Sequence, residues 1–244
     1  MCKLDRPRVD TVVTLEVIKN ILKGKQYFCE YQPFICTKTN KVEAYEALSR
    51  FHYSNQYIAP DIIFHKCHND IELFFHLESK MKEYQFKHRI KEKTLFINFD
   101  PHILLYIKGI NKIFKLFSEQ QDFVIELVEN SNMAVNIKKL VQIFEQYEYS
   151  FAVDDFFKEN SMVSTYLLNN CEYLKLDKDI LRELKRNDSF IYIVDGIVKF
   201  AHSLNKKVVL EGVETKEDIE IAKQRNIDLM QGFYFKDQFI IRKG

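Results

Sequence analysis

The sequence has few residues of the kind that separate domains. Its 244 residues include only six glycines and four prolines, and no low-complexity or linker-like stretch interrupts them. Clusters of glycine and proline are the usual signs of loops and domain boundaries. The simplest organisation is therefore one compact domain, and single barrels often reach this length.

An excess of charge of one sign is also absent, since 36 basic residues face 35 acidic ones and the net charge is +1. Proteins that bind duplex nucleic acid through its phosphates need a basic surface. We therefore expect no duplex nucleic acid partner. A small anionic ligand is still compatible, because one local site does not show in the net charge.

The chain lacks paired cysteine motifs and long apolar runs. No two of its cysteines form a Cys-x-x-Cys pair. The five cysteines are Cys2, Cys29, Cys36, Cys67 and Cys171. Scattered thiols in odd number suit a reducing cytosol. No run approaches the ~18 apolar residues of a membrane helix, and the N-terminus has no signal-like apolar segment. We expect a soluble cytoplasmic protein without membrane contacts of its own.

Short apolar or alternating runs recur along the chain and predict β-strands. Eight are expected, at residues 27–35, 41–50, 94–99, 123–127, 150–154, 173–177, 207–210 and 228–233. Segments with apolar residues at helical spacing lie between most of them, at residues 60–84, 103–117, 134–147, 191–203 and 215–225. Strands that alternate with helices in this number favour an α/β fold, a (β/α)8 barrel more than an open sheet.

The connection between the first two predicted strands is the short sequence CTKTNK. It is too short for a crossover helix, so this pair is expected to be antiparallel. The prediction is thus a modified (β/α)8 TIM-like barrel with an antiparallel first strand. Residues 11–25 have helical spacing and end near Gly24, a candidate C-cap. We expect residues 1–26 to form a helical entry segment packed on a single barrel domain, residues 27–244.

Paired carboxylates, Asp154 and Asp155, end the apolar run within SFAVDDFFKENS, residues 150–161. Adjacent acids at the end of a buried strand cost free energy unless a cation or hydrogen bonds compensate them. An isolated pair is most simply two solvated acids in a loop. The other predicted strand ends change this interpretation, because each carries polar residues among apolar neighbours: Gln32, Glu46, Asn98, Glu126, Lys175, Asp177, Glu211 and Gln231.

In a (β/α)8 barrel, the carboxyl ends of the strands form the face that carries functional side chains. Carboxylates and an asparagine gathered there are hard oxygen ligands of the kind that hold Mg²⁺ or Mn²⁺. Two such cations about 3.5–4 Å apart would remove the repulsion between the acids and stabilise an in-line phosphoryl displacement. Lys175 would add a positive charge near a phosphate oxygen or the attacking water.

A second group, His65, Lys66, Cys67 and His68, has spacings that resemble those of metal ligands. It falls in a predicted helix, far from any other run of ligand residues. No metal site is predicted there.

The strand-end residues also carry a family resemblance. Glu46-Ala47-Leu48-Ser49-Arg50 resembles the signature of the EAL-domain family, bacterial phosphodiesterases of cyclic di-GMP. Further landmarks of that family follow in order: Gln32-Pro33, Asn98 in FINFDP, Glu126 and Glu129 in IELVE, Asp154-Asp155-Phe156, Lys175 and Asp177 in KLD, Glu211 to Thr215, and Gln231 to Phe235. The resemblance extends from about residue 27 to residue 239.

This resemblance implies a modified barrel that opens cyclic di-GMP to linear pGpG with Mg²⁺ or Mn²⁺, two ions per site. By similarity, one ion is bound by Glu46, Asn98, Glu126 and Asp154, and the second by Asp154 and Asp155. Glu211 would be the general base with Lys175 as its electrostatic partner, and Asp155 would also serve the catalytic step. Substrate would be held by Gln32, Arg50 and Gln231.

Glu129 and Glu214 fall at positions that support loops in the family, although exposed acids at the start of a loop or helix would look the same. A homodimer and control by expression level or a separate regulatory protein are further expectations, since the chain has no room for a sensory domain. Phe157 to Ser161 replace the family's Gly-Thr-Gly-Tyr-Ser. Because phenylalanine and glutamate resist glycine backbone angles, this loop is expected to take another conformation.

That departure leaves two functions open. The first is an active cyclic di-GMP phosphodiesterase, which retention of every acid, the asparagine and the lysine favours. The alternative is a weak or inactive EAL domain that acts as a cyclic di-GMP receptor or protein-binding regulator.

Overall fold

The structure is a computed structural model that describes residues 13–127, 137–158 and 164–243. In this part of the chain ten strands form one sheet: β1 (Tyr27–Cys36), β2 (Val42–Tyr53), β3 (Gln56–Ile58), β4 (Thr94–Phe99), β5 (Phe123–Leu127), β6 (Phe151–Phe156), β7 (Tyr173–Leu176), β8 (Lys207–Leu210), β9 (Leu229–Met230) and β10 (Ile240–Lys243).

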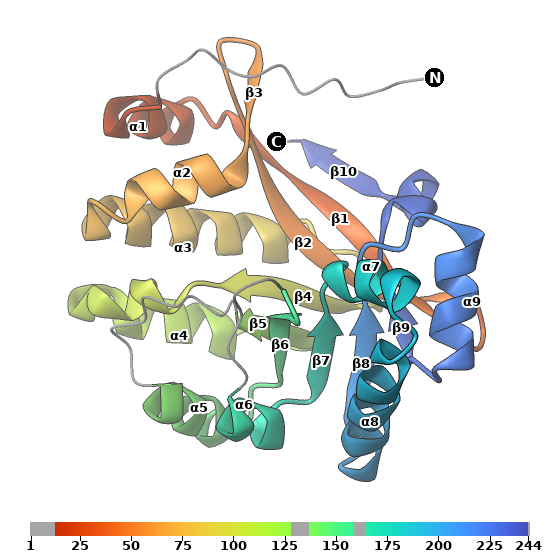
Figure 1. Cartoon of the computed structure of the whole chain (residues 1–244). Coiled ribbons are helices and arrows are strands. Elements are labelled where there is room, and N and C mark those ends of the chain that lie inside the picture. Colours follow the sequence, from red (N-terminus) through yellow and green to blue (C-terminus); the bar gives the residue numbers. More distant parts are fainter. Residues whose placement is uncertain (1–12, 128–136, 159–163, 244) are drawn as a thin grey trace.

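Helices surround these strands (Figure 1). The described helices are α1 (Leu15–Lys23), α2 (Pro60–Cys67), α3 (Ile71–Lys87), α4 (Ile110–Ser118), α5 (Ile137–Gln146), α6 (Thr165–Asn170), α7 (Asp179–Arg186), α8 (Phe190–Ser203) and α9 (Lys216–Gln224). The described residues also include three short 3₁₀ segments: η1 (Pro101–Leu105), η2 (Ile107–Gly109) and η3 (Phe233–Gln238).

Eight of the strands close into a barrel. Their order is β1-β9-β8-β7-β6-β5-β4-β2, and β1 pairs with β2 to complete the ring. Pairing is parallel from β2 through β9, whereas β1 is antiparallel to both of its neighbours. The protein is therefore an α/β modified (β/α)8 barrel with an antiparallel first strand, as the short connection after β1 predicts.

The barrel interior is filled by a small apolar cluster. Its members come from alternate positions of the strands: Phe34, Cys36, Ala44, Phe96, Val124, Ala152, Val209 and Leu229. Because side chains alternate between the two faces of a strand, the residue two positions further along each parallel strand also faces inward. The polar residues expected at the strand ends occupy those positions. They therefore form a layer directly above the apolar cluster.

The larger apolar cluster lies between the barrel and its helices. The entry helix α1 contributes Ile18 and Ile21, both fully buried. Thr14 caps this helix by accepting a hydrogen bond from the N–H of Val17, and Gly24 ends it. The helical spacing of this segment therefore reflects a face that packs on the barrel.

Several boundaries differ from the sequence prediction. Residues 60–84, expected to form one helix, are divided between α2 and α3, because Asp70 starts a new helix by accepting the N–H of Leu73 at 3.0 Å. The segment 103–117 begins with 3₁₀ turns before α4. Strand β3 lies outside the barrel and, with β10, α6 and α7, was not predicted. No helix among the described residues combines the length and apolar character needed to cross a membrane.

Candidate active site on the strand-end face

The polar strand-end residues meet on one face of the barrel. On neighbouring strands, Gln32 of β1 lies opposite Glu46 of β2, and Asn98 of β4 lies opposite Glu126 of β5. The buried members of the group are Glu46, Glu126, Asp154, Lys175 and Gln231, and the half-buried ones are Gln32, Asn98, Asp155 and Glu211. The expected gathering of acids and amides is thus present.

Glu46 is held by two amides from opposite sides. Asn98 Nδ2 donates to its Oε1 at 2.8 Å, and Gln231 Nε2 donates to its Oε2 at 2.5 Å. Burial raises the pKa of Glu46, but Lys175 and these two hydrogen bonds outweigh burial and leave its pKa below the usual range. Glu46 is therefore a carboxylate with fixed orientation.

Lys175 lies at the centre of the acids. Its Nζ is 2.6 Å from Glu126 Oε1, 2.9 Å from Asp154 Oδ1 and 2.8 Å from Glu211 Oε1. Burial alone would lower the pKa of Lys175, but the surrounding carboxylates raise it well above its usual range. Beneath it, the ring of Phe34 lies 5.8 Å from Nζ. A permanent ammonium thus stands between three acids.

A single lysine does not compensate all of these carboxylates. Burial and the charge of Glu46 raise the pKa of Glu126 well above its usual range. Burial likewise raises the pKa of Asp154, more than Lys175 lowers it. For Glu211, burial and the nearby acids raise the pKa to about 8. Without a further cation, Glu211 is therefore largely protonated at neutral pH.

A β-bulge explains how Asp154 and Asp155 both reach the site. The register between β6 and β7 shifts between Val153 and Phe156, and Asp155 has a φ of 55°. In a regular strand, two adjacent side chains would point to opposite faces, whereas a bulge re-aims one of them. Oxygen atoms of Asp154, Asp155 and Glu211 consequently lie within 4.8 Å of one another.

The residues fit divalent cations with oxygen ligands. Glu126 Oε2 is buried and has no hydrogen-bond partner within the described parts of the chain. The three acids named for the bulge form a ligand group, and Asn98 and Glu46 supply additional oxygens nearby. Cations of the Mg²⁺ or Mn²⁺ type accept such a donor set, and they would satisfy an oxygen that the protein leaves unpaired.

Glu30 is a member of this face that sequence reasoning did not identify. Its Oε1 accepts a hydrogen bond from Gln32 Nε2 at 2.8 Å and from Arg50 Nη2 at 2.8 Å. Glu30 and Gln32 are two positions apart on β1, so their side chains share a face. The alternation of side chains along β1 could therefore have indicated Glu30 from the sequence. Glu30 thus orients both of the β1–β2 residues expected to hold substrate.

Phe157 and Lys158 begin the loop after β6. Phe157 has a φ of 71°, in the left-handed region that favours glycine, and the expectation of a loop conformation different from the family's stays a prediction. Lys158 Nζ lies 2.7 Å from Asp155 Oδ2. Lys158 therefore forms an ion pair with a carboxylate that is expected to bind metal. Residues 159–163 lie outside the described part of the chain.

Of the two acids expected to support loops, the structure describes only Glu214. Glu129 lies outside the described residues. Glu214 is exposed, and its backbone N–H donates to Asp218 Oδ2 at 3.0 Å. Asp218 and Thr215 form the capping box that starts α9. The loop-supporting role of both glutamates stays a prediction.

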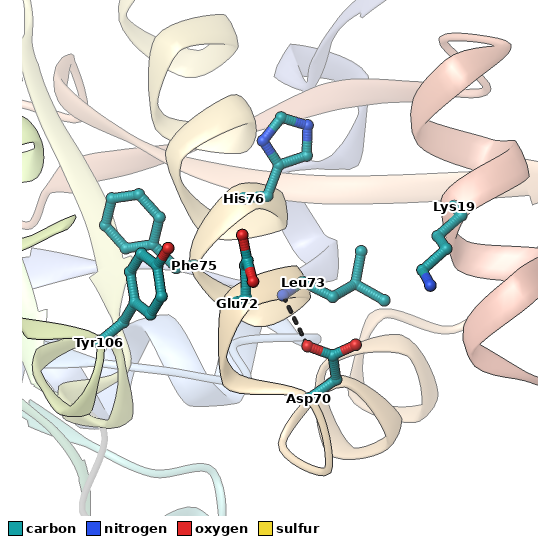
Figure 2. A pocket seen from close by; sticks show the side chains of 7 residues that line it. All are labelled: Lys19, Asp70, Glu72, Leu73, Phe75, His76 and Tyr106. Carbon is teal, nitrogen blue, oxygen red and sulfur yellow. Dashed lines mark hydrogen bonds between the residues drawn. The ribbon is translucent and has the colours of Figure 1, made fainter. Parts of the chain in front are cut away.

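A cavity of about 430 Å³ lies on the outside of the barrel, away from the acids. Figure 2 shows its lining from α1, α3 and the segment after η1: Lys19, Asp70, Glu72, Leu73, Phe75, His76 and Tyr106. Asp70 is already bonded to the start of α3. None of the strand-end residues lines this cavity. The cavity is therefore separate from the candidate active site.

Fold and site together define a modified (β/α)8 barrel with an acidic, lysine-centred site on its strand-end face. The EAL domain family matches residues 16–238, and the chain belongs to this family. Cyclic di-GMP phosphodiesterase PdeL of Escherichia coli K12 is 23% identical over 237 residues, which cover 92% of this chain and 66% of PdeL.

Solved structures show the same fold. An EAL domain protein from Listeria monocytogenes EGD-e has a TM-score of 0.74 and 25% identity, with 92% of this chain and 93% of that chain covered. Klebsiella pneumoniae BlrP1, solved at pH 9.0 as a complex with manganese and cyclic di-GMP, has a TM-score of 0.71 and 22% identity. That match covers 86% of this chain and 55% of BlrP1.

Proposed function

We propose that this protein is a metal-dependent phosphodiesterase that hydrolyses cyclic di-GMP to linear pGpG. The observation that carries the proposal is the gathering, on one face of the described barrel, of Glu46, Asn98, Glu126, Asp154, Asp155, Lys175, Glu211 and Gln231. PdeL, which is named for this activity, and BlrP1, which was solved with manganese and the dinucleotide, support the choice of substrate and metal.

Two Mg²⁺ or Mn²⁺ ions are proposed, held by Glu46, Asn98, Glu126, Asp154 and Asp155. Such ions supply charge stabilisation for the attacking and leaving oxygens of an in-line displacement. The amides of Asn98 and Gln231 fix Glu46, which keeps one side of this ligand set rigid. Proton transfer and substrate binding are assigned to side chains of the protein.

Glu211 is proposed as the general base. Burial and the neighbouring acids hold the pKa of Glu211 at about 8 in the metal-free protein, and cations bound beside it would favour the carboxylate form, which can accept a proton from a water molecule. Lys175 contacts Glu211 and Asp154, so it orients the base and places positive charge near the reacting phosphate. Attack by the water's oxygen on phosphorus breaks the bond to a 3′ oxygen, which leaves the 5′-phosphate of pGpG.

Substrate binding is assigned to Gln32, Arg50 and Gln231. The planar guanidinium of Arg50 can grip a phosphate with two parallel hydrogen bonds. Its present partner Glu30 sets the direction of that guanidinium. Glu129 and Glu214 are proposed to support the loops around this face.

The alternative function is a cyclic di-GMP receptor or protein-binding regulator with weak or no turnover. The ion pair between Lys158 and Asp155 favours it, because a metal ligand is engaged by a side-chain cation. To decide, cyclic di-GMP is incubated with purified protein and Mg²⁺ or Mn²⁺. Production of pGpG above an Asp154→Ala control supports the enzyme, while binding of the dinucleotide without pGpG supports the receptor.

A homodimer is a further part of the proposal. In the family, the loop that corresponds to residues 157–161 connects the second metal to the dimer contact. Light scattering of the purified protein with and without cyclic di-GMP measures its mass. A monomer under both conditions would contradict the dimer while leaving the phosphodiesterase assay to decide the activity.

A further inference from the structure

A second group of ligand-type side chains lies beside the strand-end face. It consists of His68, Asp100 and His102, whose ring nitrogens and carboxylate oxygens lie within 4.8 Å of one another. His68 follows α2, while Asp100 and His102 follow β4. None of the three belongs to the acid cluster around Lys175. Sequence spacing did not reveal the group, because His68 and Asp100 are 32 residues apart.

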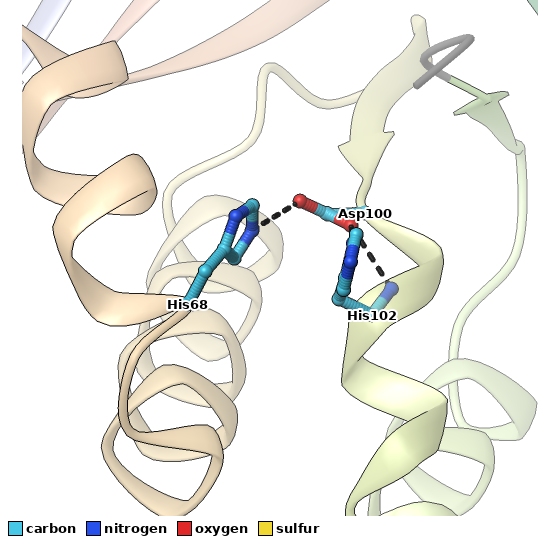
Figure 3. A group of neighbouring side chains, drawn as sticks. All are labelled: His68, Asp100 and His102. Carbon is cyan, nitrogen blue, oxygen red and sulfur yellow. Dashed lines mark hydrogen bonds and ion pairs between the residues drawn. The ribbon is translucent and has the colours of Figure 1, made fainter. Parts of the chain in front are cut away.

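Both imidazoles direct a ring nitrogen at the same carboxylate. His68 Nε2 lies 2.8 Å from Asp100 Oδ2, and His102 Nδ1 lies 3.0 Å from Asp100 Oδ1. Figure 3 shows the two rings turned toward Asp100 from separate segments of the chain. Their centroids are 4.6 Å apart with an interplanar angle of 25°. Two potential nitrogen ligands thus lie against the two oxygens of one carboxylate.

The surroundings hold this arrangement in place. The ring of Phe74 packs edge-on against His68 with centroids 4.8 Å apart. Asp100 also accepts the backbone N–H of His102 at 2.9 Å, which fixes the start of η1. All three side chains are partly exposed, at 27%, 15% and 21%. An ion can therefore reach ligands that are already oriented.

We infer that His68, Asp100 and His102 form a binding site for a borderline divalent transition metal of the Zn²⁺ type. Two imidazoles and one carboxylate make a typical zinc ligand set, with a fourth position left for water. Zinc bonds of about 2.0–2.1 Å in tetrahedral geometry require ligand atoms about 3.3 Å apart. The ligand atoms already lie within 4.8 Å of one another, and the contacts of 2.8 and 3.0 Å between the imidazole nitrogens and the two oxygens of Asp100 would lengthen to admit the ion.

This donor set distinguishes the site from the strand-end face. Imidazole nitrogen favours zinc and its neighbours in the transition series, whereas carboxylate and amide oxygens favour Mg²⁺ and Mn²⁺. The bound ion would tie the end of α2 to the segment that follows Asn98. It would therefore stiffen the β4 end of the barrel without entering the acid cluster.

Equilibrium dialysis against ZnCl₂ in a large excess of MgCl₂ tests the inference. The magnesium occupies the oxygen-rich site, and zinc retained by the intact protein is counted. One Zn²⁺ per chain is expected in the wild type and in Asp154→Asn. His68→Ala and His102→Ala are each expected to weaken zinc binding by more than about 10-fold.

His65→Ala is the matched control, since His65 is an exposed histidine on α2 close to His68. It should bind zinc like the wild type. Circular dichroism checks that each variant is folded, and the visible absorption of the Co²⁺-loaded wild type provides a readout that needs no variant. Strong tetrahedral bands are expected.

Either of two outcomes would overturn the site: no magnesium-resistant zinc in the wild type, or equal zinc in the wild type and both histidine variants. Neither measurement uses cyclic di-GMP, so failure of the zinc site and failure of the phosphodiesterase proposal are distinguishable.

Discussion

Lys175 Nζ lies 2.6 Å from Glu126 Oε1, and the two side chains are 1% and 0% exposed. A fully buried ion pair is costly to assemble, and removal of one partner leaves an uncompensated charge. The same ammonium also contacts Asp154 and Glu211. Among the residues that the structure describes, Lys175 is therefore the main internal cation that holds the strand-end acids together when no metal is bound.

Replacement of Lys175 by methionine is expected to lower the free energy of unfolding by about 3–5 kcal/mol in EDTA. Methionine keeps the apolar volume but leaves Glu126 and Asp154 without their ammonium. Denaturant unfolding in EDTA and in Mg²⁺ measures this effect. Added Mg²⁺ should restore part of the loss, because it compensates the same carboxylates. Equal stability of wild type and variant in EDTA would show that the lysine is not needed for this purpose.

Lys158→Ala is expected to lower the metal concentration required for half-maximal hydrolysis of cyclic di-GMP. The change removes the ammonium 2.7 Å from Asp155 Oδ2 and leaves that carboxylate for metal. Titration of activity with Mn²⁺ gives the midpoint. Lys223→Ala is the control, since Lys223 makes a comparable exposed pair with Glu220 at 3.1 Å on α9. A midpoint that stays constant or rises would argue against competition between Lys158 and metal.

Arg50→Lys tests the planar guanidinium at the predicted substrate face. Lysine keeps the charge but loses the paired donors, and loss of a charge-assisted hydrogen bond of about 1.5–3 kcal/mol raises KM about 10–100-fold. The value of kcat should change far less, and steady-state kinetics with cyclic di-GMP separates the two. Arg225→Lys is the matched control, because Arg225 pairs with Asp195 outside the site. An unchanged KM would remove Arg50 from substrate binding.

The pH dependence of stability should reveal the metal-free acid cluster. Burial raises the pKa of Glu211 from 4.5 to about 8. The folded protein then keeps a proton that the unfolded chain loses above pH 4.5, so this group's stabilisation is present below pH 4.5 and lost as pH rises toward 8.

Melting temperatures of the wild type in EDTA should therefore fall between pH 5 and pH 8, and Glu211→Gln should reduce this slope. Glutamine cannot ionise and retains most of the side-chain volume. Saturating Mg²⁺ should flatten the wild-type profile as well. Parallel profiles for wild type and Glu211→Gln in EDTA would assign the pH dependence to other groups.

Much of the fold was predictable because it depends on local pattern. Apolar runs and helical spacing marked the eight barrel strands, and the short connection after β1 required an antiparallel pair. Residues two positions apart on a strand share a face, so the polar strand ends could be assigned to one site. The break between α2 and α3 was missed because helical periodicity continues across it, although Asp70 supplies a local cap.

The sequence by itself determined the barrel class, the polar layer and the family resemblance, since these follow from periodicity and residue order. Only the tertiary structure decided which groups touch. The bulge that turns Asp155 inward, the hydrogen bonds that Glu30 accepts from Gln32 and Arg50, and the contact of His68 with Asp100 depend on register and on closure of the ring. The contacts of Glu30 with Arg50 and of His68 with Asp100 join separate segments of the chain, and their distances are set by packing of the whole barrel.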